Sequence, residues 1–196
     1  MKYPKGVKTS NITNKNNIYY GNRGMDLEKE LNLTNEYYHN NKIAFIYKKP
    51  TPIKIVEVDY PSRKEAIIKK AFFEKPSTTD YNGIYKGKYI DFEAKETLSS
   101  TSFPLANIHK HQIEHINNVL EQEGICFLIV RFVKKNKTFL LKGEDFITFI
   151  KEEKRKSIPL SYFEKYGYEI EDGYMPRLDY IKLIDKIYGG AYNANK

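Results

Sequence analysis

The sequence predicts one α/β sandwich, in which helices flank a central mixed β-sheet. Three observations support this fold class. Segments with apolar residues at helical spacing alternate with short strand-like runs, two of these runs are joined by a two-residue loop, and the chain has a suitable size. With 196 residues, 40% of them hydrophobic, it can bury one good core but not two full domains.

The apolar pattern predicts each element in turn. Leucines and tyrosines at helical spacing indicate a first helix, which is followed by a buried strand that Pro50 and Pro52 interrupt. A second helix ends at Gly124 and leads into two neighbouring strands. The expected elements are a helix over 25–40, strands over 43–47, 53–58, 81–85 and 88–94, a helix over 108–123, strands over 125–132 and 137–141, a helix beginning at 146 and a last helix ending at about 188.

The stretch PSTTDYNGIYKGKYIDFEAK, residues 76–95, is predicted to form a catalytic hairpin. Lys86-Gly87 is typical of a tight two-residue hairpin loop, and the register that follows places Asp80 opposite Glu93. Opposed side chains lie about 5 Å apart, and two like charges there destabilise a sheet unless a positive charge lies between them. A divalent cation is the natural candidate.

Three more side chains share the strand face of these carboxylates. Thr78 would add a hard oxygen ligand of the kind that Mg²⁺ requires, with Mn²⁺ as an alternative ion. Lys95 is close enough to meet a substrate held by that metal, and Asp91 is expected beside the metal site rather than on it. A charged strand face in contact with solvent is the alternative for an isolated D-x-E-x-K pattern.

Carboxylates on adjacent strands, with a lysine two residues after the second, resemble the PD-(D/E)xK nuclease superfamily. The longer string PSTTDYNGIYKGKYIDFEAKET, followed by TSFPLANIHKHQIEH, is similar to the RecU Holliday junction resolvases. The resemblance implies a restriction-endonuclease-like fold and a Mg²⁺-dependent endonuclease that resolves four-way DNA junctions in recombination and repair. It extends to GNRGMDLE at 21–28, KKPTP at 48–52 and PRLDY at 176–180.

The resemblance also implies residue roles and partners. Gln112 belongs to the metal site, and Lys95 positions the attacking water or stabilises the developing charge. Glu28 reaches the site from the first helix; a surface carboxylate at a positive helix end is the alternative. A homodimer with two active sites is implied, together with contacts with the recombinase and with branch-migration proteins.

Basic residues before the hairpin suggest a DNA-binding insertion. The stretch RKEAIIKKAFF, residues 63–73, has a basic and an apolar face, and the resemblance implies a stalk over about 57–76 that enters the junction centre. The alternative is a partly helical surface loop whose aromatic residues pack on the core. The stalk charges would come from Arg63, Lys64, Lys69 and Lys70.

The whole chain is basic, with 33 Lys and Arg against 25 Asp and Glu and a net charge of +8, which favours anionic partners. Residues 1–23 are rich in Lys and Asn, and we expect a flexible arm that settles on phosphates with Arg23, or a solvated tail. We expect the nuclease domain to span 24–188 and residues 189–196 to be disordered.

Composition also predicts a cytoplasmic protein. Cys126 is the only cysteine, so no intrachain disulfide can form and a reducing compartment fits. The opening residues MKYPKGVK lack the apolar core of a signal peptide, and the longest apolar run, residues 125–130, is too short to span a bilayer. We therefore expect no membrane partner.

A second motif, His111 to His115, matches the H-x-x-E-H pattern of zinc proteases. On a helical wheel both histidines fall opposite the apolar side, so a zinc centre would face outward, and no third ligand is evident. The histidines are better suited to phosphate contact or solvation. Two alternatives to a junction resolvase stay open: a sequence-specific restriction-type nuclease with the same centre, and a non-catalytic DNA-binding module.

Overall fold

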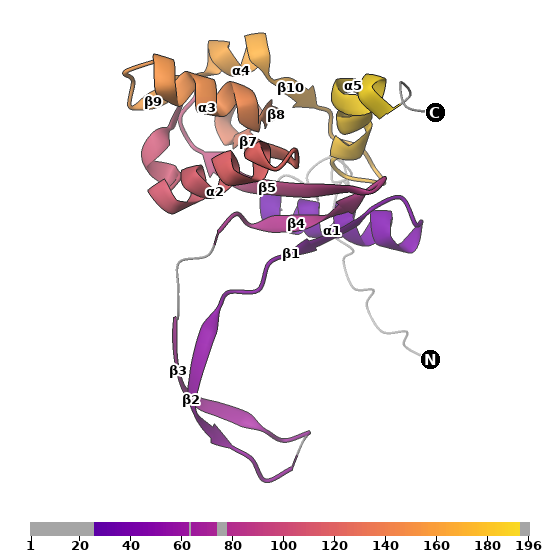
Figure 1. Cartoon of the computed structure of the whole chain (residues 1–196), viewed down its shortest axis with the longest axis vertical. Helices are drawn as coiled ribbons and strands as arrows, with labels where there is room; N and C mark the ends of the chain where they lie inside the picture. The colour runs from indigo at the N-terminus through magenta and orange to yellow at the C-terminus, as the bar shows by residue number, and fades with distance from the viewer. Residues whose placement is uncertain (1–25, 63, 74–77, 193–196) are drawn as a thin grey trace, which may run out of the picture.

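A six-stranded sheet forms the centre of the protein, as the computed structural model of the chain shows (Figure 1). The strand order is β1-β4-β5-β7-β8-β10; β5 and β7 run parallel and the other neighbours antiparallel, which confirms the predicted mixed sheet. The strands are β1 (Phe45–Lys48), β4 (Tyr81–Tyr85), β5 (Lys88–Thr97), β7 (Ile125–Phe132), β8 (Lys137–Lys142) and β10 (Tyr168–Ile170). The structure describes residues 26–62, 64–73 and 78–192.

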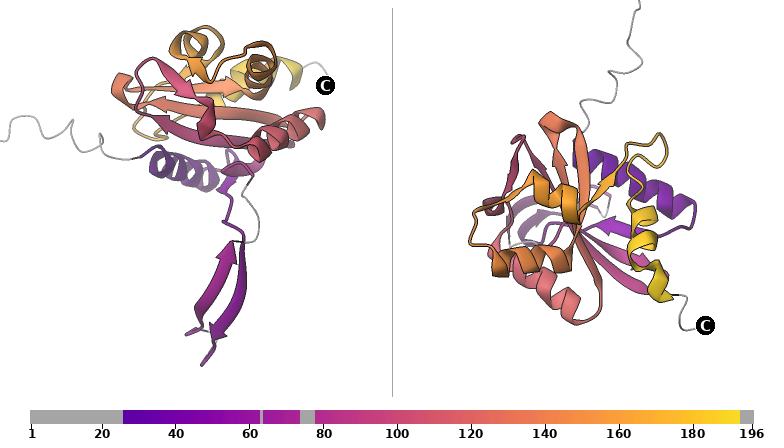
Figure 2. Two further views of the ribbon diagram at one scale, coloured as in Figure 1. Left: turned by 90° about the vertical axis from the view of Figure 1, so that its left-hand side faces the viewer. Right: turned by 90° about the horizontal axis from the view of Figure 1, so that it is seen from above.

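Helices cover both faces of this sheet, so the fold is the expected α/β sandwich (Figure 2). Along β7, Phe127 and Ile129 face the core beneath α1 and α5, whereas Leu128 and Val130 face the core beneath α2, α3 and α4. No helix of the described residues is long and apolar enough to cross a membrane. The helices are α1 (Leu27–Asn40), α2 (Lys110–Glu121), α3 (Gly143–Glu152), α4 (Leu160–Tyr166) and α5 (Tyr180–Tyr192).

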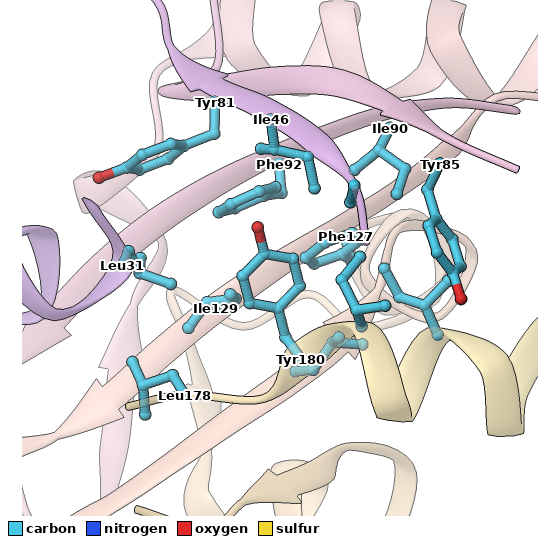
Figure 3. Packing of buried hydrophobic residues seen from close by; sticks show 14 of the residues in the cluster. Leu31, Ile46, Tyr81, Tyr85, Ile90, Phe92, Phe127, Ile129, Leu178 and Tyr180 are labelled. Carbon is cyan, nitrogen blue, oxygen red and sulfur yellow. The ribbon is translucent and has the colours of Figure 1, made fainter. Parts of the chain in front are cut away.

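Stacked aromatic rings hold the middle of the sheet on its α1 side. Tyr81 of β4 stacks on Phe92 of β5 with ring centroids 4.8 Å apart, and Phe92 stacks on Phe127 of β7 at the same distance. Tyr180 of α5 packs against both phenylalanines (Figure 3). Close packing of three neighbouring strands makes a rigid base for side chains that project from the opposite face.

A two-stranded hairpin projects from the sheet domain between β1 and β4 (Figures 1 and 2). It consists of β2 (Ile53–Asp59) and β3 (Ile67–Phe73), and every described residue of both strands is exposed. We call it the stalk hairpin. It begins at Ile53, before the expected boundary at 57. The partly helical alternative is wrong, because β3 is a strand and its two phenylalanines are exposed rather than packed on the core.

The structure differs from the sequence prediction in three ways. The first strand is not buried: β1 is an edge strand in which only Ile46 is buried, since its outer side has no neighbour in the sheet. Helix α5 continues through Tyr192 rather than ending at 188, so Gly189 and Gly190 do not stop it. The sequence pattern missed α4 and β10, together with the short pair β6 (Ser102–Pro104) and β9 (Ser157–Pro159). The arm over 1–23 and the last four residues, 193–196, lie outside the described residues.

Candidate active site

The β4–β5 hairpin sets the position of two carboxylates. Its loop, Lys86-Gly87, has positive φ at both residues, 46° and 78°, as a tight hairpin turn of this length requires. Tyr81 pairs with Phe92, so the preceding Asp80 faces Glu93 across the strands. The predicted register is therefore confirmed.

Lys95 lies between the two carboxylates. Its Nζ makes an ion pair with Glu93 Oε1 and lies 3.5 Å from Asp80 Oδ2. Asp80 Oδ2 also accepts a hydrogen bond of 3.2 Å from the Ala94 backbone N–H, which ties the Asp80 side chain to β5. The structure thus brings Asp80, Glu93 and Lys95 together, as the D-x-E-x-K pattern predicts.

The Glu93 carboxyl is in an unusual electrostatic environment. Its side chain is completely buried, and burial, together with repulsion from Asp80, raises the pKa of Glu93 to about 7 in spite of the nearby Lys95. Burial disfavours the charge on Lys95, but the attraction of Glu93 and Asp80 outweighs it, and the pKa of Lys95 is raised. Lys95 is therefore an ammonium at neutral pH.

Gln112 lies on α2 directly above Glu93. Its amide Nε2 donates to Glu93 Oε1 at 2.7 Å and to the carbonyl oxygen of Thr78 at 3.2 Å, while its Oε1 accepts from the His109 backbone N–H at 2.9 Å. In this orientation the amide nitrogen, not the oxygen, faces the carboxylate. Coordination of a cation through Oε1 would require the amide to rotate.

Glu28 lies near the same site, at the start of α1. It lines a cavity of about 250 Å³ that Asp80 and Lys95 also border. Its half-exposed carboxylate forms an ion pair with Lys48 at the end of β1. The structure therefore places Glu28 next to the site but in contact with a lysine.

Asp91 belongs to a buried polar cluster that the sequence pattern did not reveal. Its carboxylate is completely buried and pairs with Lys49 at 2.6 Å. It also accepts hydrogen bonds from the hydroxyls of Thr79 and Tyr89. Lys49, Thr79 and Tyr89 were not identified from sequence; the only signal was the position of Lys49 directly after β1, where the chain enters the stalk hairpin.

His115 points toward the sheet, which corrects the helical-wheel prediction. Its Nε2 lies 3.1 Å from Asp91 Oδ2, whereas His111 stacks on the ring of His109. The wheel failed because the sheet beneath the first turns of α2 carries carboxylates, so polar residues of the helix face inward there. Because His111 and His115 make separate contacts, they do not form the shared zinc site that the zinc-protease alternative requires.

The residues around Glu93 fit a hard divalent cation bound partly by substrate. Glu93 Oε2 is buried and has no hydrogen-bond partner, so its lone pairs are available to a cation. Within residues 26–62, 64–73 and 78–192 no three His, Cys, Asp or Glu side chains are grouped to hold a metal by themselves. Mg²⁺ commonly uses one or two carboxylates together with waters and substrate phosphate, which matches this donor set.

The charged residues expected to bind DNA are only partly described. Lys64, Lys69 and Lys70 are exposed on the stalk hairpin, and Lys69 pairs with Asp59 across it at 3.0 Å. Arg23 and Arg63 lie outside the described residues. The hairpin therefore carries positive charge away from the carboxylate site.

The chain is similar to proteins of one family over most of its length. The family model of Recombination protein U, RecU, matches residues 22–186. Proteins named Holliday junction resolvase RecU are 56% identical in Geobacillus sp. (strain WCH70) and 57% identical in Pediococcus pentosaceus, over 86% of this chain and 86% and 85% of theirs. One from Geobacillus kaustophilus is 50% identical over 96% of this chain and 98% of its own. The chain therefore belongs to the RecU family.

Proposed function

We propose that this protein is a divalent-metal-dependent endodeoxyribonuclease that resolves four-way DNA junctions. The observation that carries the proposal is the buried Glu93, opposite Asp80 and paired with Lys95, in a chain whose relatives are named Holliday junction resolvases. A carboxylate pair with an adjacent ammonium suits hydrolysis of a phosphodiester, in which negative charge accumulates at the phosphate.

Asp80 and Glu93 would hold the cation, which we propose to be Mg²⁺, with Mn²⁺ as a substitute. When bound, the metal would neutralise charge on the phosphate and lower the pKa of the attacking water. Gln112 contacts both Glu93 and the Thr78 carbonyl oxygen, and Thr78 and Gln112 are proposed as further oxygen donors, Gln112 after rotation of its amide. Glu28 and Asp91 support the site without binding the metal.

Lys95 would act on the phosphate as a fixed positive charge. Because the pKa of Lys95 is raised, its side chain keeps its proton at neutral pH and cannot accept one from water. A preorganised ammonium can orient the water through a hydrogen bond and stabilise charge that develops on the phosphate. Lys95 is therefore proposed as an electrostatic catalyst rather than as a base.

The assembly and location of the protein are proposed from the proposed reaction and from the family resemblance. Resolution of a four-way junction requires two strands to be cut, and the described residues hold one candidate metal site, that of Asp80, Glu93 and Lys95, which favours a homodimer. Lys64, Lys69 and Lys70 of the stalk hairpin, with Arg23 and Arg63, would neutralise phosphates. Work on DNA junctions suits a cytoplasmic protein, and the resemblance to RecU resolvases implies contacts with the recombinase and with branch-migration proteins.

The decisive experiment compares a four-way junction with a linear duplex of the same sequence. We expect cleavage of the junction only when Mg²⁺ or Mn²⁺ is present, with little cutting of the duplex. Equal cleavage of both substrates would favour a restriction-type nuclease. Junction binding without cutting under any metal condition would favour a non-catalytic DNA-binding module.

The raised pKa of Glu93 predicts that metal binding depends on pH. A proton on Glu93 competes with the cation, so metal affinity should rise with pH until the carboxyl is ionised near pH 7. We expect an increase of about tenfold per pH unit below that value and little change above it. Calorimetric titration with Mn²⁺ at pH 6, 7 and 8 measures this. An affinity equal at pH 6 and pH 8 would contradict the predicted competition.

Removal of positive charge from the stalk hairpin should reduce the preference of the protein for a four-way junction over a linear duplex. Lys64→Gln with Lys70→Gln is expected to lower the ratio of junction to duplex affinity by about tenfold, equivalent to about 1.4 kcal/mol, because both exposed lysines belong to the stalk hairpin, which projects from the sheet domain. Binding assays at one fixed salt concentration test this. Lys134→Gln with Lys135→Gln, which removes the same charge from an exposed turn of the sheet domain, is the matched control. An equal ratio in both double variants would argue against the stalk as the junction reader.

A further inference from the structure

Lys49 joins both ends of the stalk hairpin to the sheet. It lies where the chain leaves β1, and only 14% of its side chain is exposed. Its Nζ donates to the hydroxyls of Thr78 and Thr79, at 3.0 and 2.7 Å, on the segment that returns from the hairpin. Its backbone N–H donates to the carbonyl oxygen of Asp80 at 2.8 Å. One residue thus links the outgoing and returning segments.

Asp91 anchors this lysine from below. The Asp91 carboxylate is completely buried, and its ion pair with Lys49 is reinforced by Tyr89, whose hydroxyl donates at 2.7 Å, and by the contact with His115 at 3.1 Å. A buried carboxylate that lost its counterion would be strongly unfavourable, so the pair restricts Lys49 to one position. The Lys49 ammonium and the Asp91 carboxylate are each hydrogen-bonded on several sides, so neither side chain can shift easily.

The contacts of Lys49 connect it indirectly to both candidate metal-binding carboxylates, Asp80 and Glu93. Thr78, which Lys49 holds through its hydroxyl, accepts from Gln112 through its carbonyl oxygen, and that amide also donates to Glu93 at 2.7 Å. Asp80 follows Thr78 by two residues and is held to Lys49 through its backbone. A shift of Lys49 would therefore move the supports of Asp80 and Glu93 together.

We propose that Lys49, locked by Asp91, is a positioning residue that sets the spacing of the Asp80 and Glu93 carboxylates. This inference rests on the proposed metal-dependent nuclease function. Lys49 acts through Thr78, Thr79 and the Asp80 backbone and contacts neither of the two carboxylate side chains. Groups that orient metal ligands commonly change metal affinity or activity by about 10- to 100-fold when they are removed.

Whether Lys49→Met raises or lowers the metal affinity distinguishes a positioning role of Lys49 from a purely electrostatic one. Lys49→Met removes a positive charge close to a cation site and exposes the cation to an unpaired Asp91, so electrostatics alone would leave metal affinity unchanged or raise it. If Lys49 instead positions the Asp80 and Glu93 carboxylates, its removal should lower the metal affinity. We expect Mn²⁺ to bind about 10- to 100-fold more weakly to Lys49→Met, and single-turnover junction cleavage to slow by a similar factor.

The test uses the full chain and two readouts besides cleavage: calorimetric titration with Mn²⁺, and junction affinity without metal, which should stay near the wild-type value. Lys88→Met removes the same charge from the far end of β5 and should leave both the Mn²⁺ affinity and the rate intact. Mn²⁺ affinity in Lys49→Met equal to or above that of the wild type would overturn the inference. If the wild type shows no metal-dependent cleavage, the proposed function fails instead.

A second variant covers the case in which Lys49→Met does not fold. Lys49→Met with Asp91→Asn leaves no unpaired buried charge and keeps the size of both side chains. Circular dichroism establishes that it is folded. Because the double variant loses one charge of each sign, electrostatics alone should leave Mn²⁺ affinity near the wild-type value, whereas loss of positioning should weaken it by about 10- to 100-fold. Wild-type affinity in the folded double variant would overturn the inference.

Discussion

Replacing Glu93 by glutamine should abolish junction cleavage while leaving junction binding nearly intact. The substitution keeps the shape of a completely buried side chain but removes the charge on which a divalent cation depends. Metal assistance is worth several kcal/mol in phosphoryl chemistry, so we expect the rate to fall by about 10³-fold or more. Asp80→Asn should behave in the same way. Binding should persist because phosphates are neutralised mainly by Lys and Arg.

Single-turnover cleavage and a gel-shift titration of the same junction measure the two quantities separately. Glu121→Gln, which removes a carboxylate from the exposed end of α2, is the matched control and should cut normally. Wild-type cleavage by Glu93→Gln at saturating Mg²⁺ would end the active-site assignment. Loss of binding together with cleavage would instead assign Glu93 a structural role.

The geometry of the β4–β5 hairpin could be predicted because it depends on local rules. A two-residue loop that requires positive φ fixes the register of its strands, and the two-residue period of a strand then decides which side chains share a face. Lys86-Gly87 and the alternation from Lys88 to Lys95 contain both rules. Asp80, Glu93 and Lys95 could thus be brought together without any knowledge of the remaining fold.

The inward position of His115 could not be predicted, since it depends on what lies beneath helix α2. A helical wheel assumes an apolar surface below, and this holds for Ile116 and Val119, which pack in the core. The earlier turns lie over Asp91 and Glu93, so His115 faces Asp91 although the wheel places it opposite the apolar side. In the core, apolar side chains face the interior, whereas over buried carboxylates the polar side chains of the helix face inward.

The second strand of the stalk hairpin, β3, and Lys49 were missed for different reasons. Both faces of β3 are exposed, so no alternation of apolar and polar residues marks it as a strand, and the segment 63–73 was compatible with an amphipathic element. Lys49 is one of 33 basic residues, and its importance comes from the approach of Asp91, which is 42 positions away in the chain. Such a contact leaves no short-range pattern in a single sequence.

The second large effect is expected for Lys95→Met, which should slow cleavage by about 10²- to 10³-fold, equivalent to about 3 to 4 kcal/mol, the usual loss for one preorganised donor at a transition state. The Lys95 ammonium touches Glu93 and lies 3.5 Å from Asp80, so it is within reach of a phosphate held by the same carboxylates. Metal affinity should not fall, because removal of a cation does not weaken a neighbouring cation site.

Lys95→Gln separates charge from hydrogen bonding, since glutamine keeps a donor but has no charge. If charge is decisive, both Lys95 variants should cut equally slowly; if a hydrogen bond to the water is enough, glutamine should recover part of the rate. Lys88→Met, on the same strand but away from the carboxylates, controls for the loss of one charge. Single-turnover cleavage rates at saturating Mg²⁺ test these expectations. A wild-type rate for Lys95→Met would mean that Lys95 only balances the charge of Glu93. The phosphate would then be stabilised by the metal and by other basic residues.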